Sequence, residues 1–216
     1  MHLMNNNMSQ AKQILIWKNE ADLADISVNS DETVDVLGVF TEGFVDKQKL
    51  SVRLNGHDAK LKMSLIFVGN AEEEFDLQTV VEHLDKSSVS EIIVRAVLLG
   101  KSSINFAGKV IIPGTAQRSE TDLRFQTLLL SPYAQARTIP SLEIIANDVK
   151  AGHSASVGRL DEELLFYLQT RGFDKSSASE LLIEGFLKEA LCDLDDDQQI
   201  EQWNIISHKL ASHTHE

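Results

Sequence analysis

Apolar and polar residues alternate with a period of two along most of the first 158 positions. The segment 50–54 reads Leu-Ser-Val-Arg-Leu, and the segment 61–67 continues the alternation with larger apolar residues. Such alternation is typical of β-strands that bury one face. Further runs of this kind follow at FDLQTVV, EIIVRAVLL, SINFAG, KVII, DLRFQTLLL and SLEIIA. The sequence therefore predicts a mainly β body of short strands over residues 10–158.

The spacing of these strands limits the architecture. Their centres lie about 10 to 17 residues apart, which leaves no room for crossover helices and excludes a doubly wound α/β sheet. An antiparallel sandwich or barrel favours two-residue hairpin turns, and the one strong example is Asn55-Gly56. A parallel β-helix accepts irregular polar corners between its strands. Periodicity alone leaves both of these architectures open.

From about residue 159 the pattern changes to that of helices. Asp161 is the expected N-cap of a first helix, and Gly172 fits the left-handed residue that follows its last turn. A second helix is expected from about Ser177, where Ser177 and Glu180 form a capping-box pattern, and a third over 198–211. Because the first two helices are too short to be stable alone, we expect both to pack on the β body.

Composition and charge narrow the class of protein. The 216 residues carry a net charge of −13, which argues against nonspecific binding to nucleic acid or to anionic membranes. No apolar run approaches 18 residues, and the first ten residues lack the pattern of a signal peptide. We expect a cytoplasmic protein with a flexible tail over 1–9, the β body over 10–158 and a C-terminal α-helical subdomain over 159–216.

Few residues are candidates for catalysis or metal binding. Cys192 is the one cysteine, so the chain alone forms no disulfide and no all-cysteine metal site; we expect it to be a buried, inert thiol. No Gly-x-Ser-x-Gly elbow and no P-loop occur, which argues against a serine hydrolase and against ATP hydrolysis by this chain. His57 beside the Asn-Gly turn is expected at the surface, and His83 is expected to have a structural role in the body.

His153 is the candidate functional histidine. In an extended chain it points to the same side as Val149, Ala151, Ala155 and Val157, which are all small or apolar. The pattern aims the imidazole at an interior. One interpretation is a core histidine whose ring nitrogens are satisfied by backbone partners. The alternative is a functional histidine.

Several ordered motifs surround His153. The segment ANDVKAGHSASVG is followed by LDEELLFYLQTRGF, and GKVIIPGTAQRSETD, TLLLSPYAQAR and PSLEII precede them. Together they resemble the SufB/SufD family, the scaffold proteins of the SUF iron-sulfur cluster assembly machinery. The resemblance covers residues 83–191, about half the chain. It is closer to the SufD side, because AGHS stands where SufB-like chains carry Glu-His-Glu-Ala.

The resemblance implies a right-handed parallel β-helix with an exposed terminal coil. It also implies a non-catalytic scaffold that pairs through the β-helix with a SufB-like subunit, or with itself, and docks a SufC-type ATPase through its helices. His153 would then be a metal residue at the pairing surface, touching iron or a transient cluster shared with the partner. The FYLxxRG motif assigns partner binding to Phe166, Tyr167, Arg171 and Gly172.

The chain departs from the family at two points. Ala151 stands where the family has a cysteine, which puts a thiolate contribution in doubt, so no cluster is expected to be held stably by this chain alone. The chain is also much shorter than typical members, which suggests a minimal or divergent form. The alternative function is a β-helix binding or regulatory module for an ABC-type ATPase, with no direct role at iron. A polysaccharide hydrolase or lyase is disfavoured, because the acidic residues gather at corners and in the helical end.

Overall fold

The strands form two parallel sheets. A computed structural model describes residues 12–192 and 194–211. The six-stranded sheet contains, from one edge to the other, β1 (Lys12–Trp17), β3 (Thr33–Phe40), β5 (Lys60–Gly69), β7 (Val89–Leu98), β9 (Glu120–Leu129) and β11 (Lys150–Gly158). The five-stranded sheet contains β2 (Ile26–Val28), β4 (Gln48–Leu54), β6 (Glu74–His83), β8 (Ser103–Ile112) and β10 (Gln135–Ile144).

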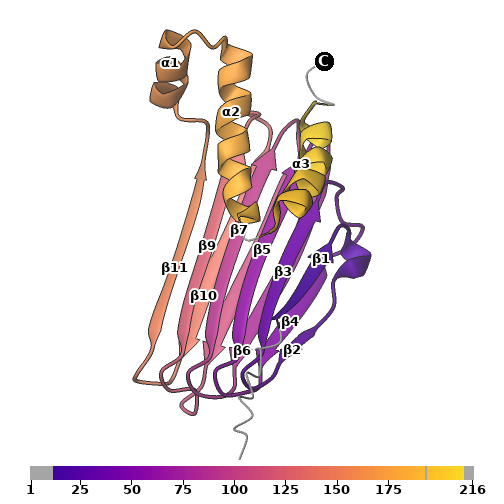
Figure 1. Ribbon diagram of the computed structural model, residues 1–216. Coiled ribbons are helices and arrows are strands. Elements are labelled where there is room, and N and C mark those ends of the chain that lie inside the picture. The colour runs from indigo at the N-terminus through magenta and orange to yellow at the C-terminus, as the bar shows by residue number, and fades with distance from the viewer. Residues whose placement is uncertain (1–11, 193, 212–216) are drawn as a thin grey trace, which may run out of the picture.

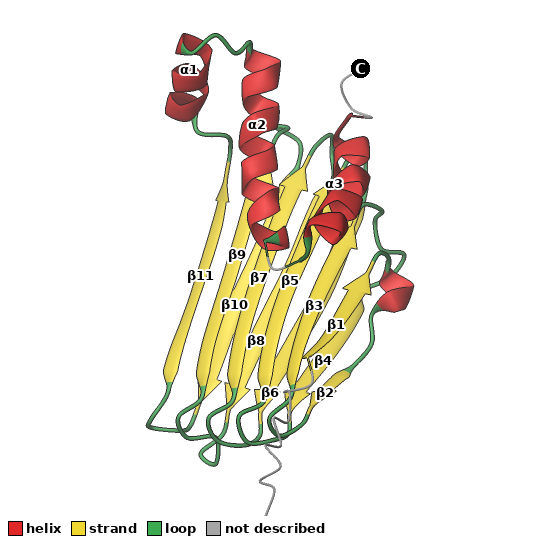
Figure 2. Cartoon of the chain, in the orientation of Figure 1, coloured by secondary structure: helices red, strands yellow, loops and turns green. Residues whose placement is uncertain are grey.

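Successive strands alternate between the two sheets, as Figures 1 and 2 show. Every ladder is parallel, so the chain winds as a right-handed parallel β-helix of about five turns. The fold class expected from the family resemblance is confirmed, and the antiparallel alternative is wrong.

The corners of the coils share one backbone conformation. Asp31, Asp58, Ser87 and Arg118 all have positive φ angles and stand at the same corner of successive coils. The N–H of Ser87, for example, donates to the carbonyl of Gln117 in the next coil over 2.9 Å. These bonds continue the parallel ladder around the corner, which explains why hairpin signals are rare in the sequence.

The Asn55-Gly56 pair does not form a hairpin; it lies at a corner where two neighbouring coils pack closely. A Cβ at Gly56 would lie 2.0 Å from the Ser30 backbone nitrogen of the neighbouring coil, so only glycine fits there.

The interior of the coil is filled by the inward-facing residues of both sheets. Phenylalanines of successive coils stack on one another: the ring centroids of Phe40 and Phe67 lie 5.1 Å apart, and those of Phe106 and Phe125 lie 4.7 Å apart. Leucine, valine and isoleucine fill most of the remaining inward positions, and most of these side chains are fully buried. This stack is the main core, and it repeats from coil to coil because inward residues pair in register.

Two helices cover part of the outer face of the six-stranded sheet. These are α2 (Lys175–Lys188), which continues into the 3₁₀ helix η2 (Glu189–Leu191), and α3 (Asp196–Ala211) (Figure 1). Under them, most outward residues of β3, β5 and β7 are apolar as well, and they form a second core with Leu99, which follows β7, and with the helices. Its members are Leu37, Val39, Ile66, Val68, Ile93, Val97 and Leu99 with Ile183, Leu187, Ala190, Leu191 and Ile206. The middle strands are therefore buried on both faces.

Helix α1 (Glu162–Thr170) does not pack on the sheets as expected. It has no buried residue and contacts mainly α2, beyond the ends of the strands (Figure 1). Its caps are as predicted: Asp161 accepts hydrogen bonds from the N–H groups of Glu163 and Leu164, and Gly172 has a φ of 99°. The expectation failed because α1 gains its support from another helix.

The predicted starts of the other two helices need a small correction. Helix α2 begins at Lys175, where Asp174 caps it by accepting from the Ser177 N–H, two residues earlier than expected. Helix α3 begins at Asp196, so part of the acidic segment after Cys192 belongs to its first turn.

The proposed tail over 1–9 lies outside the described residues. The last strand ends at Gly158 and the first helix begins at Glu162, and the division into domains stays a prediction. No helix in the described part of the chain is long and apolar enough to cross a membrane.

Candidate pairing and docking surfaces

The last coil of the β-helix is open. In the described structure β11 pairs only with β9, and β10 pairs only with β8, so each presents an unpaired strand edge on the same side. At the opposite end of the stack β1 and β2 also have one neighbour each, and Trp17 of β1 belongs to the core and is only 5% exposed. The two ends therefore differ in their inner faces, because Trp17 is buried on β1 whereas the inward-facing residues of β11 are exposed.

His153 lies on the inner face of this open coil. The register of β11 on β9 places it beside Leu123, while Ala151 and Ala155 stand beside Thr121 and Phe125. Those β9 residues are buried, so the predicted inward direction of His153 is correct. His153 itself is exposed, and its interpretation as a buried core histidine is wrong. The cause is that β11 is the last strand of its sheet among residues 12–192 and 194–211, so no further coil there covers it.

The open coil also exposes large apolar side chains. Val157 on the inner face of β11 is 46% exposed, Ile144 at the end of β10 is 39% exposed, and the adjacent Ile145 is 65% exposed. Ala151 and Ala155 lie on the same inner face of β11, and their side chains are short. An apolar face beside unpaired strand edges is the usual form of a surface that pairs with another sheet.

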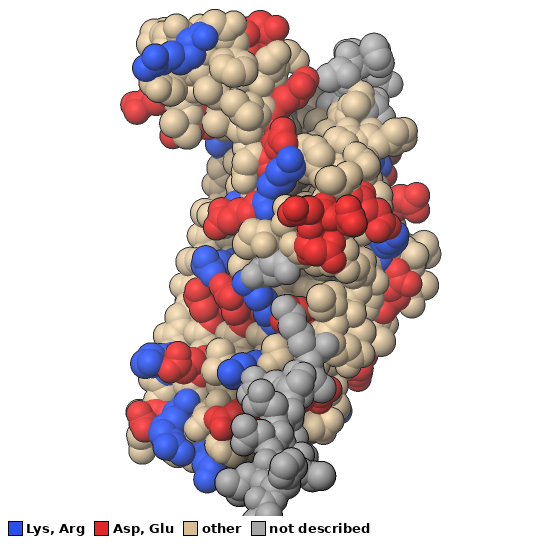
Figure 3. All heavy atoms as spheres, viewed as in Figure 1, with Lys and Arg blue, Asp and Glu red and all other residues tan. Residues whose placement is uncertain are grey.

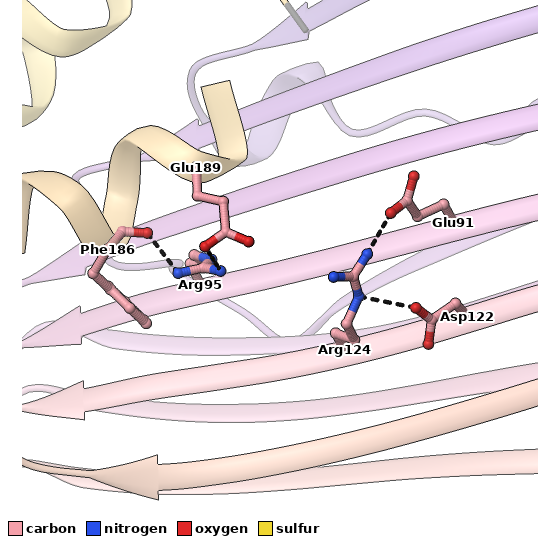
Figure 4. A network of polar contacts seen from close by, with 6 residues as sticks. All are labelled: Glu91, Arg95, Asp122, Arg124, Phe186 and Glu189. Carbon is pink, nitrogen blue, oxygen red and sulfur yellow. Dashed lines mark hydrogen bonds and ion pairs between the residues drawn. The ribbon is translucent and has the colours of Figure 1, made fainter. Parts of the chain in front are cut away.

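The charges near this end lie on the outer face. Lys150 pairs with Glu120 over 2.6 Å, and Arg124 pairs with Asp122 over 3.0 Å and with Glu91 (Figures 3 and 4). These side chains thus have ionic partners within the chain. The inner face of β11 carries one titratable group, the imidazole of His153.

Ligands for a metal ion are sparse. In the described residues no three His, Cys, Asp or Glu side chains gather into a group that could hold a metal ion. Cys192 is exposed at the end of η2, so the prediction of a buried thiol is wrong: η2 ends at the buried Leu191, and Cys192 follows it at the surface. Since η2 packs against β5 and β7, Cys192 is not brought beside His153. His153 therefore belongs to no metal-binding group among the described residues.

His83 has the structural role that the sequence predicts. It is fully buried in the coil, with Nδ1 2.8 Å from the Ser88 hydroxyl and Nε2 2.9 Å from the Ser90 hydroxyl. The Ser88 hydroxyl donates to the Asp85 carbonyl, so it must accept from His83, and Nδ1 carries the proton. Nε2 then accepts from Ser90. Burial lowers the pKa of His83 from 6.5 to about 4, because desolvation disfavours the imidazolium.

His57 lies near the corner after β4, as expected for a surface residue. Its ring pairs with Asp58 over 3.0 Å, and its side chain is 46% exposed.

Residues 161–172, which contain α1, form a helical arm that presents exposed aromatic side chains. On α1, Phe166 is 68% exposed and Tyr167 is 52% exposed. The guanidinium of Arg171 lies over the Tyr167 ring, 5.1 Å from its centroid, and Gly172 then ends the helix. The four residues of the FYLxxRG motif are therefore brought together at one accessible end of the molecule. Aromatic residues that stay exposed on a short helix are typical of a protein-binding surface.

Sequence patterns did not reveal the residue that fixes α2 to the sheet. Arg95 of β7 is only 5% exposed; its guanidinium donates to the Phe186 carbonyl over 2.7 Å and to Glu189 over 2.5 Å, and it lies 4.7 Å from the Phe186 ring centroid (Figure 4). Burial lowers the pKa of Arg95, and Glu189 opposes that effect. The one signal was a charged residue inside the apolar run EIIVRAVLL.

Comparison with known proteins agrees with this architecture. The family model for the SUF system FeS cluster assembly, SufBD core domain, matches residues 19–186. The iron-sulfur cluster assembly protein SufD of Escherichia coli is 30% identical over 179 residues, which is 82% of this chain and 42% of that protein. SufD of Bacillus subtilis is 32% identical over 151 residues, 70% of this chain and 34% of that protein.

A third relative is covered over more of its length. The SufBD family protein ycf24 of Galdieria sulphuraria is 28% identical over 157 residues, 73% of this chain and 71% of that protein. The chain spans less than half the length of the two SufD proteins. With a family match over most of its residues and a matching β-helix, the chain belongs to the SufBD family of iron-sulfur cluster assembly proteins.

Proposed function

We propose that this protein is a non-catalytic, SufD-like scaffold subunit of the SUF iron-sulfur cluster assembly complex. It pairs with a SufB-like subunit, or with a second copy of itself, through the edges of β10 and β11. The observation that carries the proposal is the open terminal coil, where unpaired strand edges flank an exposed apolar face that includes Val157. A second open coil placed against it would satisfy the backbone groups and bury that face.

His153 would act at this joint. A neutral imidazole ligates iron well, and its place on the open inner face sets it beside whatever side chains the partner contributes. Iron or a nascent cluster is the cargo here. With Ala151 in place of the family cysteine and Cys192 elsewhere, this chain would supply one nitrogen and the partner would supply the thiolates.

The helical arm would dock the ATPase. Phe166 and Tyr167 are exposed next to Arg171, and α1 is tied to β11 by a connection of only a few residues. A SufC-type ATPase bound to α1 would therefore hold the segment that leads directly out of the pairing strand.

Light scattering of the purified chain, alone and mixed with a SufB-like subunit at tens of micromolar, tests the pairing. We expect a dimer or a mixed complex. A monomer that does not change on mixing would overturn the proposal.

The alternative function is a binding or regulatory module for an ABC-type ATPase without a role at iron, and Ala151 is the observation that favours it. The change His153→Ala separates the two functions. Loss of iron from the paired complex, with pairing intact, supports the scaffold; unchanged iron content supports the module.

A further inference from the structure

Helix α3 carries a buried amide that has no hydrogen-bond partner. Gln202 is fully buried, and neither its Nε2 nor its Oε1 makes a hydrogen bond with any residue that the structure describes. Ile206 lies one helical turn further along the same face of α3 and belongs to the second core, so the amide faces the sheet as well. An unpaired amide disfavours the packed state of the helix, because water would satisfy both atoms if the helix moved away.

The apolar contacts that hold α3 in place are few. Of the residues of α3, all of which the structure describes, Ile206 is the one apolar side chain that is fully buried, whereas α2 buries three. Trp203, Ile205 and Leu210 pack against the second core only in part. Helix α2 is also fixed by the buried guanidinium of Arg95, which has partners on that helix and on η2. The two helices therefore differ in how firmly they are attached to the same sheet.

Two ion pairs fix the position of α3 on the β body. Glu201 pairs with Lys18, just after β1, over 2.9 Å, and Lys209 pairs with Glu73, just before β6, over 2.5 Å. The first pair is weak, because both of its side chains are at least half exposed. Helix α3 is the last element that the structure describes, and it contributes to no strand ladder. Its release would thus leave both sheets intact.

We propose that α3 is a releasable cover on the outer face of the six-stranded sheet. In the docked state it lies against β5, as Figure 1 shows, and shields part of the second core. In the released state the amide of Gln202 is hydrated and apolar side chains of the sheet become accessible. The position of α3 then controls access to this face without unfolding the β-helix. The device does not depend on the proposed function, because it follows from the packing of α3 alone.

Native-state hydrogen exchange of the purified full chain, followed by mass spectrometry, measures the release. We expect the amides of α3 to exchange about a hundredfold faster than those of β7 while the β-helix stays folded. Gln202→Met keeps a side chain of similar length and removes the unpaired amide, so exchange in α3 should slow about tenfold. Gln198→Met makes the same change at a partly exposed position of α3 and is the matched control, with exchange expected to be unchanged.

Three results would overturn the proposal. Amides of α3 that exchange as slowly as those of β7 would show that the helix is not released. Equal exchange in Gln202→Met and Gln198→Met would show that the buried amide does not set the equilibrium. A lower melting temperature together with faster exchange of α3 in Gln202→Met would show that the amide stabilises the docked helix. Slower exchange confined to Gln202→Met, with a melting temperature that is equal or higher, supports the cover.

Discussion

The imidazole of His153 stands next to Leu123 in the same inward-facing row, yet Leu123 is fully buried and His153 is exposed. The two residues share a face of the coil and differ in what lies beyond them. Leu123 is covered by β11, and no strand among the described residues covers β11. The position of His153 thus combines the inward direction of a core residue with the exposure of a surface residue.

Charge on the open inner face should prevent pairing without unfolding the chain. Val157→Lys places an ammonium group on a surface that pairing would bury, so we expect at least a tenfold weaker dimer or mixed complex. The matched control is Ser156→Lys, on the outer face of the same strand. Because both sites are exposed, each change should alter the free energy of unfolding by less than about 1 kcal/mol. Equal pairing of both variants in light scattering would contradict the assignment of the inner face.

Acid should weaken the fold through His83. Its pKa is lowered from 6.5 to about 4 in the folded state, so between these values the unfolded chain binds a proton that the native chain does not. Stability is therefore full above pH 6.5 and falls as the pH drops towards 4, by roughly 3 kcal/mol from this group. Urea unfolding at several pH values measures the effect.

His83→Gln cannot gain this proton. We expect the variant to be less stable than the original chain at pH 7, because the packing around Ser88 and Ser90 is disturbed. The difference between the two proteins should shrink as the pH falls from 6.5 to 4. Parallel curves over this range would show that His83 does not resist protonation.

Removing Glu189 should cost more stability than removing Arg95. The guanidinium of Arg95 is buried, so Glu189→Ala leaves a charge with only the Phe186 carbonyl and ring as partners, at a cost of about 2–3 kcal/mol. Arg95→Met removes the charge, keeps apolar contact with Phe186 and leaves Glu189 in solvent, at about 1 kcal/mol. Denaturant unfolding of the two variants gives the order. The reverse order would mean that the pair, rather than the buried charge, sets the stability of α2.

Truncation of the exposed Tyr167 side chain on α1 should weaken binding of the ATPase and leave the stability of the fold nearly unchanged. Tyr167 is 52% exposed, so Tyr167→Ala should barely change the melting temperature, whereas loss of an aromatic anchor costs about 2 kcal/mol or more of ATPase binding. Gln169→Ala, on the opposite side of α1, is the control. A large drop in melting temperature with unchanged affinity of the folded fraction would remove Tyr167 from the docking site.

Reconstitution with iron and sulfide should fail for the chain alone. Cys192 is the one thiol, and the described residues contain no metal-binding group of three or more ligands. We expect no stoichiometric visible absorbance, in the original chain or in Cys192→Ser. Stable absorbance that survives Cys192→Ser would require histidine and carboxylate ligation and would overturn this prediction.

Much of the fold follows from local pattern. Period-2 alternation locates the strands because each residue's face is set by its immediate neighbours, and the caps at Asp161 and Gly172 are equally local. The choice of a parallel coil over an antiparallel sandwich came from the family resemblance. Periodicity alone does not make that choice, because strand pairing joins residues about 30 positions apart, such as Leu123 and His153.

Local sequence pattern also predicts only part of the candidate site. Alternation predicted the direction of His153 correctly, but its exposure depends on whether another coil follows, which no local pattern records. The predicted burial of Cys192 is wrong for a related reason, since the residue lies just past Leu191, the last residue of η2 and a buried one. Arg95 and Glu189 lie 94 residues apart along the chain, and their contact depends on where α2 crosses β7.

The corner residues Asp31, Asp58, Ser87 and Arg118 follow one another at intervals of 27, 29 and 31 positions, and each donates its backbone N–H to the corner of the next coil. The helices α2 and α3 rest on β3, β5 and β7, so one whole coil could be added or removed without disturbing that second core only beyond β7. The coil that contains Trp17 and the coil that contains His153 would then keep their own contacts. The distance between the two ends of the stack would change in steps of one coil.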